Sequence, residues 1–144
     1  MDTNKLLTTK DSLLALSPLI LVVEDDADNQ LLLKYTIAMF GWEYIFAMNA
    51  IDAITIAKEK SPDLILLDIV MPDFDGFQAA NLLKNHNQTQ NIPLIAVTGL
   101  IGKEEQKLIF SSGFDRYVSK PYALDDLRQA IVSILDNTNK FCRL

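Results

Sequence analysis

The sequence predicts an α/β fold in which helices cover both faces of a parallel β-sheet. Short aliphatic runs alternate with longer segments whose apolar residues recur at helical spacing. The aliphatic runs contain few polar residues, which is typical of strands that are buried on both faces. Because strand-then-helix alternation gives parallel strands with right-handed crossovers, five such units predict one doubly wound sheet.

Five segments are predicted strands, and the second of them is the weakest. They span residues 19–23, 43–47, 64–67, 92–97 and 116–118. The first helix is predicted to begin at a cap formed by Asp26 or Asp28 and to end at Gly41. The other helices are predicted at residues 50–60 before Ser61-Pro62, 76–86 after the cap Asp75, 103–112 before Gly113, and 123–135.

The length and composition indicate one cytoplasmic domain. At 144 residues, 49% of them hydrophobic, the chain can bury a full core but has little room for a second domain. Residues 1–17 are predicted to be a leader of unknown role, residues 18–137 the domain, and residues 138–144 a tail. Cys142 is the single cysteine, so a disulfide framework is excluded and a reducing compartment is expected.

Charge and hydropathy argue against two classes of partner. The net charge of −6 disfavours nucleic acid, because phosphate binding requires clustered Lys and Arg and the 13 present are spread along the chain. The apolar segment 13–23 is interrupted at Ser17-Pro18 and is shorter than the roughly 20 residues of a membrane span. We therefore expect neither nucleic acid nor a membrane as a partner.

Polar residues follow the predicted strands at the points where the strands end. Glu24 and Asp25 come directly after the first strand, Asp68 after the third, Thr98 after the fourth and Lys120 after the fifth. The carboxyl ends of parallel strands meet at one edge of a sheet, and the ligands of such sheets bind there. We therefore expect three carboxylates, a hydroxyl and an ammonium group to converge at one site.

A cluster of carboxylates favours a bound cation. Neighbouring carboxylates disfavour each other's charge, so either one is protonated or a cation lies between them. Carboxylate oxygens open to water suit Mg²⁺, which also binds phosphate oxygens. An ionised Asp can attack phosphorus and form an acyl phosphate. Asp68 is the best candidate for that nucleophile, because it follows the most buried strand and Lys120 and Thr98 are expected beside it.

Four sequence motifs resemble those of one protein family. They are residues 21–26 (LVVEDD), 67–76 (LDIVMPDFDG), 96–99 (AVTG) and 117–121 (YVSKP). Together they closely resemble the receiver domains of response regulators in two-component signal transduction, and the resemblance spans residues 19–135. The chain resembles a stand-alone, chemotaxis-regulator-like receiver, and the alternative is a receiver taken from a larger regulator or hybrid kinase. This resemblance implies a flavodoxin-like (βα)5 fold with strand order 2-1-3-4-5.

The resemblance implies a role for each acidic residue at this edge. Asp68 is implied to be the phosphoacceptor. Glu24, Asp25, Asp68 and the backbone carbonyl of Val70 are implied to hold Mg²⁺, for which Mn²⁺ can substitute. Glu24 is expected to act through water, whereas Asp25 contacts the ion directly. Asp26 follows the acidic pair and is given no ligand role.

A second group is implied to bind the phosphoryl group and to switch. Lys120, before a cis peptide bond to Pro121, is expected to pair with the phosphoryl oxygens. Thr98 is expected to donate a hydrogen bond to them, after which Tyr117 turns inward along a path that Gly99 leaves open. The switched surface is predicted within residues 103–135. Its candidate members are Ile109, Phe110, Tyr122, Ala130 and Val132. Some of these are expected to be exposed, and the alternative for each is that it fills the core.

The resemblance also implies the partners. A sensor histidine kinase or a histidine phosphotransfer protein is expected to donate the phosphoryl group, and an unknown downstream protein to bind the surface within residues 103–135. The chain is then a signalling switch that catalyses only its own phosphorylation and dephosphorylation. Val70 and Leu100 are apolar where some relatives carry polar groups that orient water. This difference predicts a long-lived phosphorylated state.

Three other functions fit parts of the pattern. An Mg²⁺-dependent hydrolase would also form an aspartyl phosphate, but such enzymes place a second acid where Val70 stands. A calcium loop at residues 73–76 fails, because positions 1 and 12 of an EF-hand would be Met71 and Leu82. A phosphorylation-independent interaction module would lack a key residue of the site, and none is missing.

Overall fold

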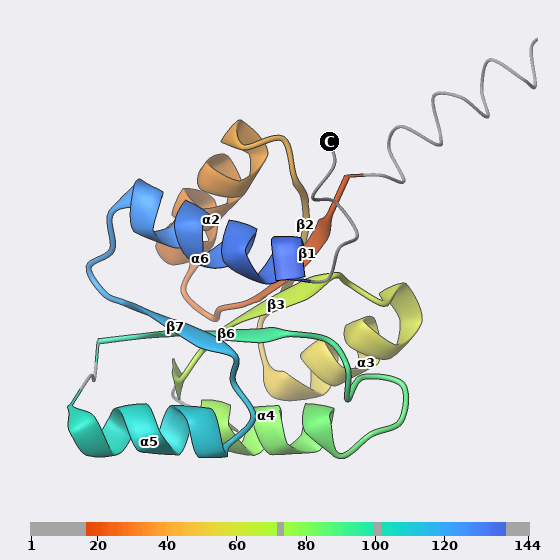
Figure 1. The fold of residues 1–144 in the computed structure, drawn as a ribbon. Helices are drawn as coiled ribbons and strands as arrows, with labels where there is room; N and C mark the ends of the chain where they lie inside the picture. Colours follow the sequence, from red (N-terminus) through yellow and green to blue (C-terminus); the bar gives the residue numbers. More distant parts are fainter. Residues whose placement is uncertain (1–16, 72–73, 100–101, 138–144) are drawn as a thin grey trace, which may run out of the picture.

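The computed structural model confirms the predicted α/β architecture, with one parallel sheet between two layers of helices (Figure 1). It describes residues 17–71, 74–99 and 102–137. The predicted tail, with Cys142, lies outside the described residues, and so do Leu100 and all of the predicted leader except Ser17. Among the helices of the described part, none is both long enough and apolar enough to cross a membrane.

Five strands form the sheet in the order β2-β1-β3-β6-β7, all parallel. Counted along the chain, this is the predicted order 2-1-3-4-5. The strands are β1 (Leu19–Val23), β2 (Glu43–Ala47), β3 (Leu64–Asp68), β6 (Leu94–Thr98) and β7 (Arg116–Ser119). β3 and β6 each extend one residue beyond the prediction, so Asp68 and Thr98 are the last residues of their strands. β6 begins two residues later than predicted, after Pro93.

The strand residues alternate between two hydrophobic cores, as side chains on a pleated sheet must. Ile20, Val22 and Leu66 face the core under α2 (Ala27–Met39) and α6 (Leu124–Asn137). Leu21, Val23 and Leu67 face the core under three other helices. These helices are α3 (Ala50–Lys60), α4 (Gly76–Lys84) and α5 (Lys103–Ser111). Figure 1 shows the two groups on opposite faces of the sheet.

Two of the predicted caps place helices directly beside the carboxyl edge of the sheet. The Asp26 carboxylate accepts a hydrogen bond from the Asn29 amide at 2.9 Å and begins α2. The Asp75 carboxylate accepts one from the Phe77 amide at 2.8 Å and begins α4. α4 ends at Lys84, two residues before the predicted end. Asp26 is therefore used as a cap, consistent with its having no ligand role.

A short antiparallel hairpin between β3 and α4 was not predicted. It consists of β4 (Val70–Met71) and β5 (Phe74–Asp75), which pair only with each other in the described part of the chain. Gly76 follows the hairpin and packs against the residue after β3. Its amide donates a hydrogen bond to the Ile69 carbonyl at 3.0 Å. A Cβ atom at Gly76 would lie 2.6 Å from the Ile69 Cα atom. The close packing of this glycine holds the chain that follows Asp68.

The predicted switch surface is only partly exposed. Phe110 is exposed and Tyr122 and Val132 are half-buried, but Ile109 and Ala130 are buried. Phe110 therefore belongs to the exposed surface, whereas Ile109 and Ala130 follow the alternative, in which these residues fill the core. Their positions on α5 and α6 turn them toward the sheet, where each joins one of the two cores.

Candidate functional site

Asp68 lies at the carboxyl end of β3 with both carboxylate oxygens engaged. Oδ1 accepts a hydrogen bond from the Val70 amide at 3.1 Å, and Oδ2 accepts one from Lys120 Nζ at 3.0 Å. Only 7% of its side chain is exposed. Since β3 is central in the sheet and pairs with both β1 and β6, the backbone beneath this carboxylate is held on two sides. The structure therefore presents one carboxylate in a fixed orientation.

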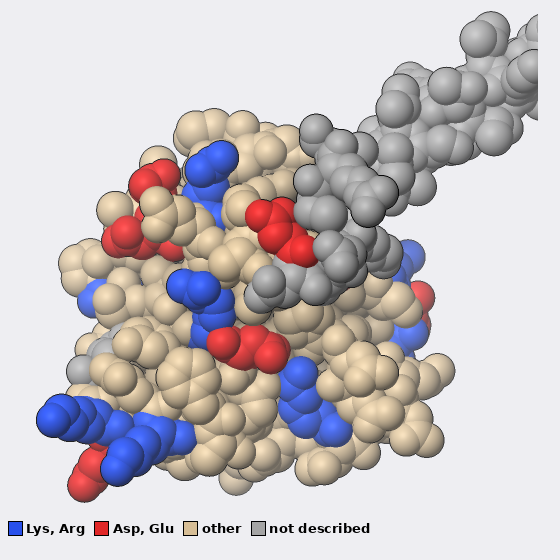
Figure 2. All heavy atoms as spheres, viewed as in Figure 1, with Lys and Arg blue, Asp and Glu red and all other residues tan. Residues whose placement is uncertain are grey.

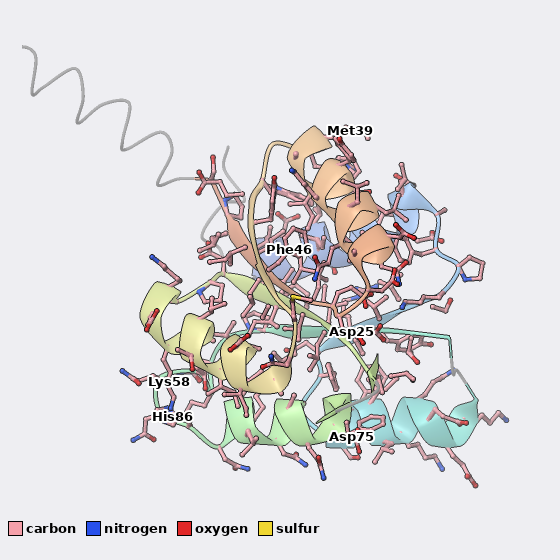
Figure 3. All side chains as sticks on the ribbon, turned by 180° about the vertical axis from the view of Figure 1, so that it is seen from behind. Asp25, Met39, Phe46, Lys58, Asp75 and His86 are labelled. Carbon is pink, nitrogen blue, oxygen red and sulfur yellow. The ribbon has the colours of Figure 1, made fainter. Side chains whose placement is uncertain are left out.

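Two further acids from the end of β1 meet Asp68. Oxygen atoms of Glu24, Asp25 and Asp68 all lie within 4.8 Å of one another. Glu24 is buried, and its carboxylate accepts a hydrogen bond from the Asp26 amide at 3.2 Å. Asp25 is half-buried and lies just before the N-terminal end of α2, whereas Met39 is at the C-terminal end of that helix (Figure 3). The predicted convergence of three carboxylates is thus present in the structure.

Lys120 brings a positive charge to the acids from the end of β7. Its Nζ atom lies 3.0 Å from Asp68 Oδ2 and 3.7 Å from Glu24 Oε1. The Lys120 amide donates to the Thr98 carbonyl at 2.8 Å, and the following peptide bond to Pro121 is cis, as predicted. The chain therefore turns at Pro121 after it has placed the ammonium group between two strand ends.

The electrostatics of the cluster raise three pKa values. Burial, together with the charge of Asp68, raises the pKa of Glu24 from 4.5 to about 7, despite the Asp26 amide and Lys120, which act in the opposite direction. Burial alone would lower the pKa of Lys120, but the hydrogen bond and charge of Asp68 and the charge of Glu24 raise it above 10.5. Burial, and then the charges of Glu24 and Asp68, raise the pKa of Tyr122 to about 12. Burial is thus the main reason for the raised pKa values of Glu24 and Tyr122, and the neighbouring acids add to it.

This arrangement fits a hard divalent cation. All three acidic side chains offer oxygen, and the pKa of Glu24 is raised, mainly by burial and in part by the charge of Asp68, even with Lys120 close by. Around the acids is an open hollow of about 520 Å³, which leaves space for water and for a phosphate-sized group. It is lined by Glu24, Asp25, Asp26, Asn29, Asp68, Val70, Gly99 and Lys120. Mg²⁺ favours oxygen ligands of this kind and keeps several waters.

Thr98 directly precedes Gly99, which lines this hollow, whereas Tyr117 lies on the edge strand β7 and does not line it. Thr98 is buried at the end of β6, in register with Ser119 of β7. Tyr117 is half-buried, and its ring meets the Phe110 ring of α5 edge-on at a centroid distance of 5.9 Å. It lines a separate groove between β7 and α6. The structure thus brings Thr98 to the site and leaves Tyr117 on the neighbouring surface.

Three residues near the site were not identified from the sequence as site residues. Asn29 lines the hollow because it lies in the first turn of α2, directly above the acidic pair. Tyr122 lines an adjoining pocket of about 360 Å³ together with Glu24 and Lys120. Gly76 supports the loop that follows Asp68. The helix phase after Asp26 could have indicated Asn29, but the places of Tyr122 and Gly76 depend on the paths of loops.

Comparison with known proteins identifies a family. Residues 20–132 match the model of the response regulator receiver domain. The chain is 34% identical over 116 residues to the polar-differentiation response regulator DivK of Brucella anthropi, which covers 81% of this chain and 94% of that protein. The DivK protein of Brucella ovis gives the same identity and coverage. The segment that matches the family model, residues 20–132, contains all four motifs on which the predicted resemblance rests.

Solved structures show the same fold. A two-component response regulator from Clostridium difficile is 28% identical, with a TM-score of 0.78 and coverage of 85% of this chain and 99% of that chain. The receiver domain of the sensor histidine kinase PA1611 from Pseudomonas aeruginosa is 23% identical, with a TM-score of 0.77 and coverage of 83% and 98%. That receiver was solved with a magnesium ion coordinated in its active site cleft. At this lower identity, the second comparison supports the fold alone.

Proposed function

This chain belongs to the response regulator receiver domain family of two-component systems, and on that premise we propose that Asp68 accepts a phosphoryl group from a phosphohistidine donor. One observation carries the proposal. The Asp68 carboxylate is held by the Val70 amide and Lys120 at the edge of an open hollow, with two other acids close by. Such a group is oriented before its substrate arrives.

The transfer exchanges one bond to phosphorus for another. An oxygen of Asp68 attacks the phosphorus atom, the new O–P bond forms, and the bond from phosphorus to the donor's imidazole nitrogen breaks. The imidazole leaves with the electron pair of that bond. Lys120, now 3.0 Å from Asp68 Oδ2, moves its charge to the phosphoryl oxygens. Hydrolysis later returns the carboxylate and releases inorganic phosphate.

Glu24, Asp25, Asp68 and the Val70 carbonyl would hold Mg²⁺, with Mn²⁺ as a substitute. When bound, Mg²⁺ offsets the negative charge of the phosphoryl oxygens. The cluster of three acids, whose oxygen atoms lie within 4.8 Å of one another, supports this assignment. The Glu24 carboxylate, buried and already bonded to the Asp26 amide, is suited to act through a water molecule. Asp25 is half-buried and open to direct contact.

The response begins at Thr98 and ends on the surface formed by α5, β7 and α6. A phosphoryl group on Asp68 offers new acceptor oxygens, and the Thr98 hydroxyl turns toward them. Tyr117 then moves from its contact with Phe110 into the space that Thr98 leaves. Gly99 leaves this path open, since nothing lies within 4 Å of a Cβ atom built there. A downstream protein binds the changed surface.

Receiver domains interact with histidine kinases or phosphotransfer proteins, and we place this chain with such a donor in the cytoplasm. The family is one of signalling switches and not of metabolic enzymes. Here the chain would catalyse only its own phosphorylation and dephosphorylation. Val70 stands two residues after Asp68, where a phosphate-ester hydrolase would carry its second acid. The apolar Val70 counts against the hydrolase, and no contact of the described residues favours it.

Acetyl phosphate, followed by intact mass measurement, tests the phosphoacceptor. With Mg²⁺ present, the protein should gain the mass of one phosphoryl group, and with a chelator in place of Mg²⁺ it should gain none. Asp68→Asn should abolish the gain. Asp75→Asn, which changes an exposed capping residue of α4, should leave the gain intact. Phosphorylation of Asp68→Asn, or an equal gain without Mg²⁺, would overturn the assignment.

A further inference from the structure

α2 is apolar on two opposite faces, which is unusual for a helix at the surface of a domain. Leu33, Thr36 and Ile37 form its buried face against the sheet. On the outward face, four large apolar side chains are exposed: Leu31 (50%), Leu32 (50%), Tyr35 (62%) and Met39 (65%). A surface helix normally carries polar residues there, and a helix that is apolar all round is normally covered. We call these four residues the outer stripe of α2.

The outer stripe distinguishes α2 from the other described helices. α3, α4 and α6 each expose one large apolar residue, and α5 exposes two, whereas α2 exposes four. The residues on the other helices are Ile51, Leu82, Leu124, Leu108 and Phe110. Isolated residues of this kind are common on soluble proteins. The four residues of the outer stripe recur at helical spacing and so form one continuous patch. A contiguous exposed patch of this sort marks a surface that binds something apolar.

The leader carries a matching pattern. Leu6 and Leu13 are seven residues apart, and so are Leu7 and Leu14, a spacing that would place all four on one face if this segment were a helix. Positions 7, 10 and 14 have the same spacing as Leu32, Tyr35 and Met39. In two parallel helices, position 7 could therefore face Leu32, position 10 Tyr35 and position 14 Met39. Lys10 lies on the same face, and its aliphatic stem can cover apolar surface while its ammonium group stays in water.

The connection to β1 allows this packing. The Pro18 carbonyl accepts a hydrogen bond from the Glu43 amide at 2.9 Å, so the chain enters the domain beside the segment that follows the C-terminal end of α2. Residues 15–18 span up to about 13 Å when extended. Two packed helices need only about 8–10 Å between their axes. A helix that ends near residue 14 can therefore lie along α2.

The tether favours this occupant over a second copy of the chain. A stable interface between two proteins buries about 800 Å² on each partner, more than four partly exposed side chains on one helix supply. A segment joined by a short connection acts at an effective concentration in the millimolar range, so it needs less buried area. We propose that residues 3–14 form a helix that packs parallel to α2 and covers its outer stripe.

Disulfide trapping tests the packing with a matched control. In a Cys142→Ser background, Leu7→Cys with Leu32→Cys places two thiols at facing positions. Thr8→Cys with Leu32→Cys has nearly the same tether but puts the leader thiol on the far side of the helix. In a glutathione buffer at low protein concentration, the first pair should form an intramolecular disulfide at least tenfold faster than the second.

Two outcomes of the trapping would overturn the proposal. Equal rates for the two pairs would mean that the leader does not dock in this orientation. Disulfide-linked dimers as the main product would assign the stripe to a second copy of the chain.

Hydrogen exchange provides a test without cysteines. Leu7→Asp combined with Leu14→Asp should release the leader and speed exchange of the α2 amides several-fold. Thr8→Asp combined with Ser12→Asp adds the same charge to the far side of the leader helix and should leave exchange unchanged. Slow exchange in both variants, or fast exchange in both, would contradict docking through the leucine face.

Discussion

The inner and outer strands at the carboxyl edge of the sheet differ in how firmly they are held. Every residue of β3 is buried, and β1 and β3 each pair with a strand on both sides. β7 pairs only with β6, and three of its four residues are exposed or half-buried. Asp68 and the acidic pair follow the inner strands. Tyr117, the proposed responding residue, lies on the outer strand.

This difference separates the two tasks of a switch. Phosphoryl transfer requires a carboxylate in a fixed position, and neighbouring strands on both sides supply that position. A response requires an element with two accessible arrangements, and an edge strand with a half-buried tyrosine supplies one. Charges on the face shown in Figure 2 do not mark out either region, since Lys and Arg are interspersed with Asp and Glu.

The largest effect should come from Gly76→Ala in the rigid region. The new Cβ atom would lie 2.6 Å from the Ile69 Cα atom and 3.0 Å from the Asp68 carbonyl oxygen, so the backbone must move. We expect the free energy of unfolding in urea to fall by about 3 kcal/mol. Gly99→Ala, in open space, should change it by about 0.5 kcal/mol or less. If Gly76→Ala and Gly99→Ala lowered the free energy of unfolding equally, the close packing of Gly76 would not be what holds the loop after Asp68.

A second effect concerns the protonation of Glu24. Its pKa rises from 4.5 in the unfolded chain to about 7 in the folded one, so the folded state binds the proton more tightly. The stabilisation from this proton is complete below pH 4.5 and is lost as the pH rises to about 7. Without divalent cations, Glu24→Gln should therefore gain stability over the parent at pH 8, by about 2 kcal/mol.

Urea unfolding at pH 5 and pH 8 in a chelator would measure the pH effect. Glu59→Gln, on the exposed face of α3, is the control and should follow the parent at both values. If Glu24→Gln and the parent showed the same dependence of the free energy of unfolding on pH, the raised pKa of Glu24 would not affect stability.

A third and smaller effect tests the link between the two regions. Thr98→Ala should still accept a phosphoryl group on Asp68 but should lose most of the response at Tyr117, because no hydroxyl moves toward the new oxygens. Fluorotyrosine NMR of Tyr117, before and after acetyl phosphate with Mg²⁺, would measure that response. Thr98→Ser keeps the hydroxyl and should retain it. A full response in Thr98→Ala would break the proposed connection.

The smallest effect concerns the lifetime of the phosphorylated state. Val70 is 58% exposed and lines the hollow, so Val70→Asn would place an amide where water attacks. One added hydrogen bond is worth about 0.5–1.5 kcal/mol, which corresponds to a loss of phosphate about two- to twelvefold faster. Intact mass over time measures it, with Leu82→Asn on α4 as the control. An unchanged lifetime would count against a role for Val70.

Much of this arrangement could be predicted from the sequence, because strand ends are marked by a change from aliphatic to polar residues. Val23-Glu24, Leu67-Asp68 and Val97-Thr98 are such points, and the structure places all three at one edge. The caps at Asp26 and Asp75 were predictable for the same local reason. Parallel pairing then requires the residues after these points to meet.

Other features depend on information that local patterns do not contain. The two-residue strands of the β4–β5 hairpin are too short to show a period. The inward positions of Ile109 and Ala130 depend on the rotation of α5 and α6 about their axes, which an apolar residue near the edge of a helical face leaves undecided. The place of Tyr122 depends on how the chain turns after the cis peptide bond at Pro121.

A crystal structure grown with Mg²⁺ and beryllofluoride would test the central claim directly. We expect beryllium bonded to an oxygen of Asp68, Lys120 in contact with a fluoride, and the metal ion bound among Glu24, Asp25 and Asp68. Beryllofluoride bound elsewhere, or a metal ion that contacts none of these acids, would contradict the account.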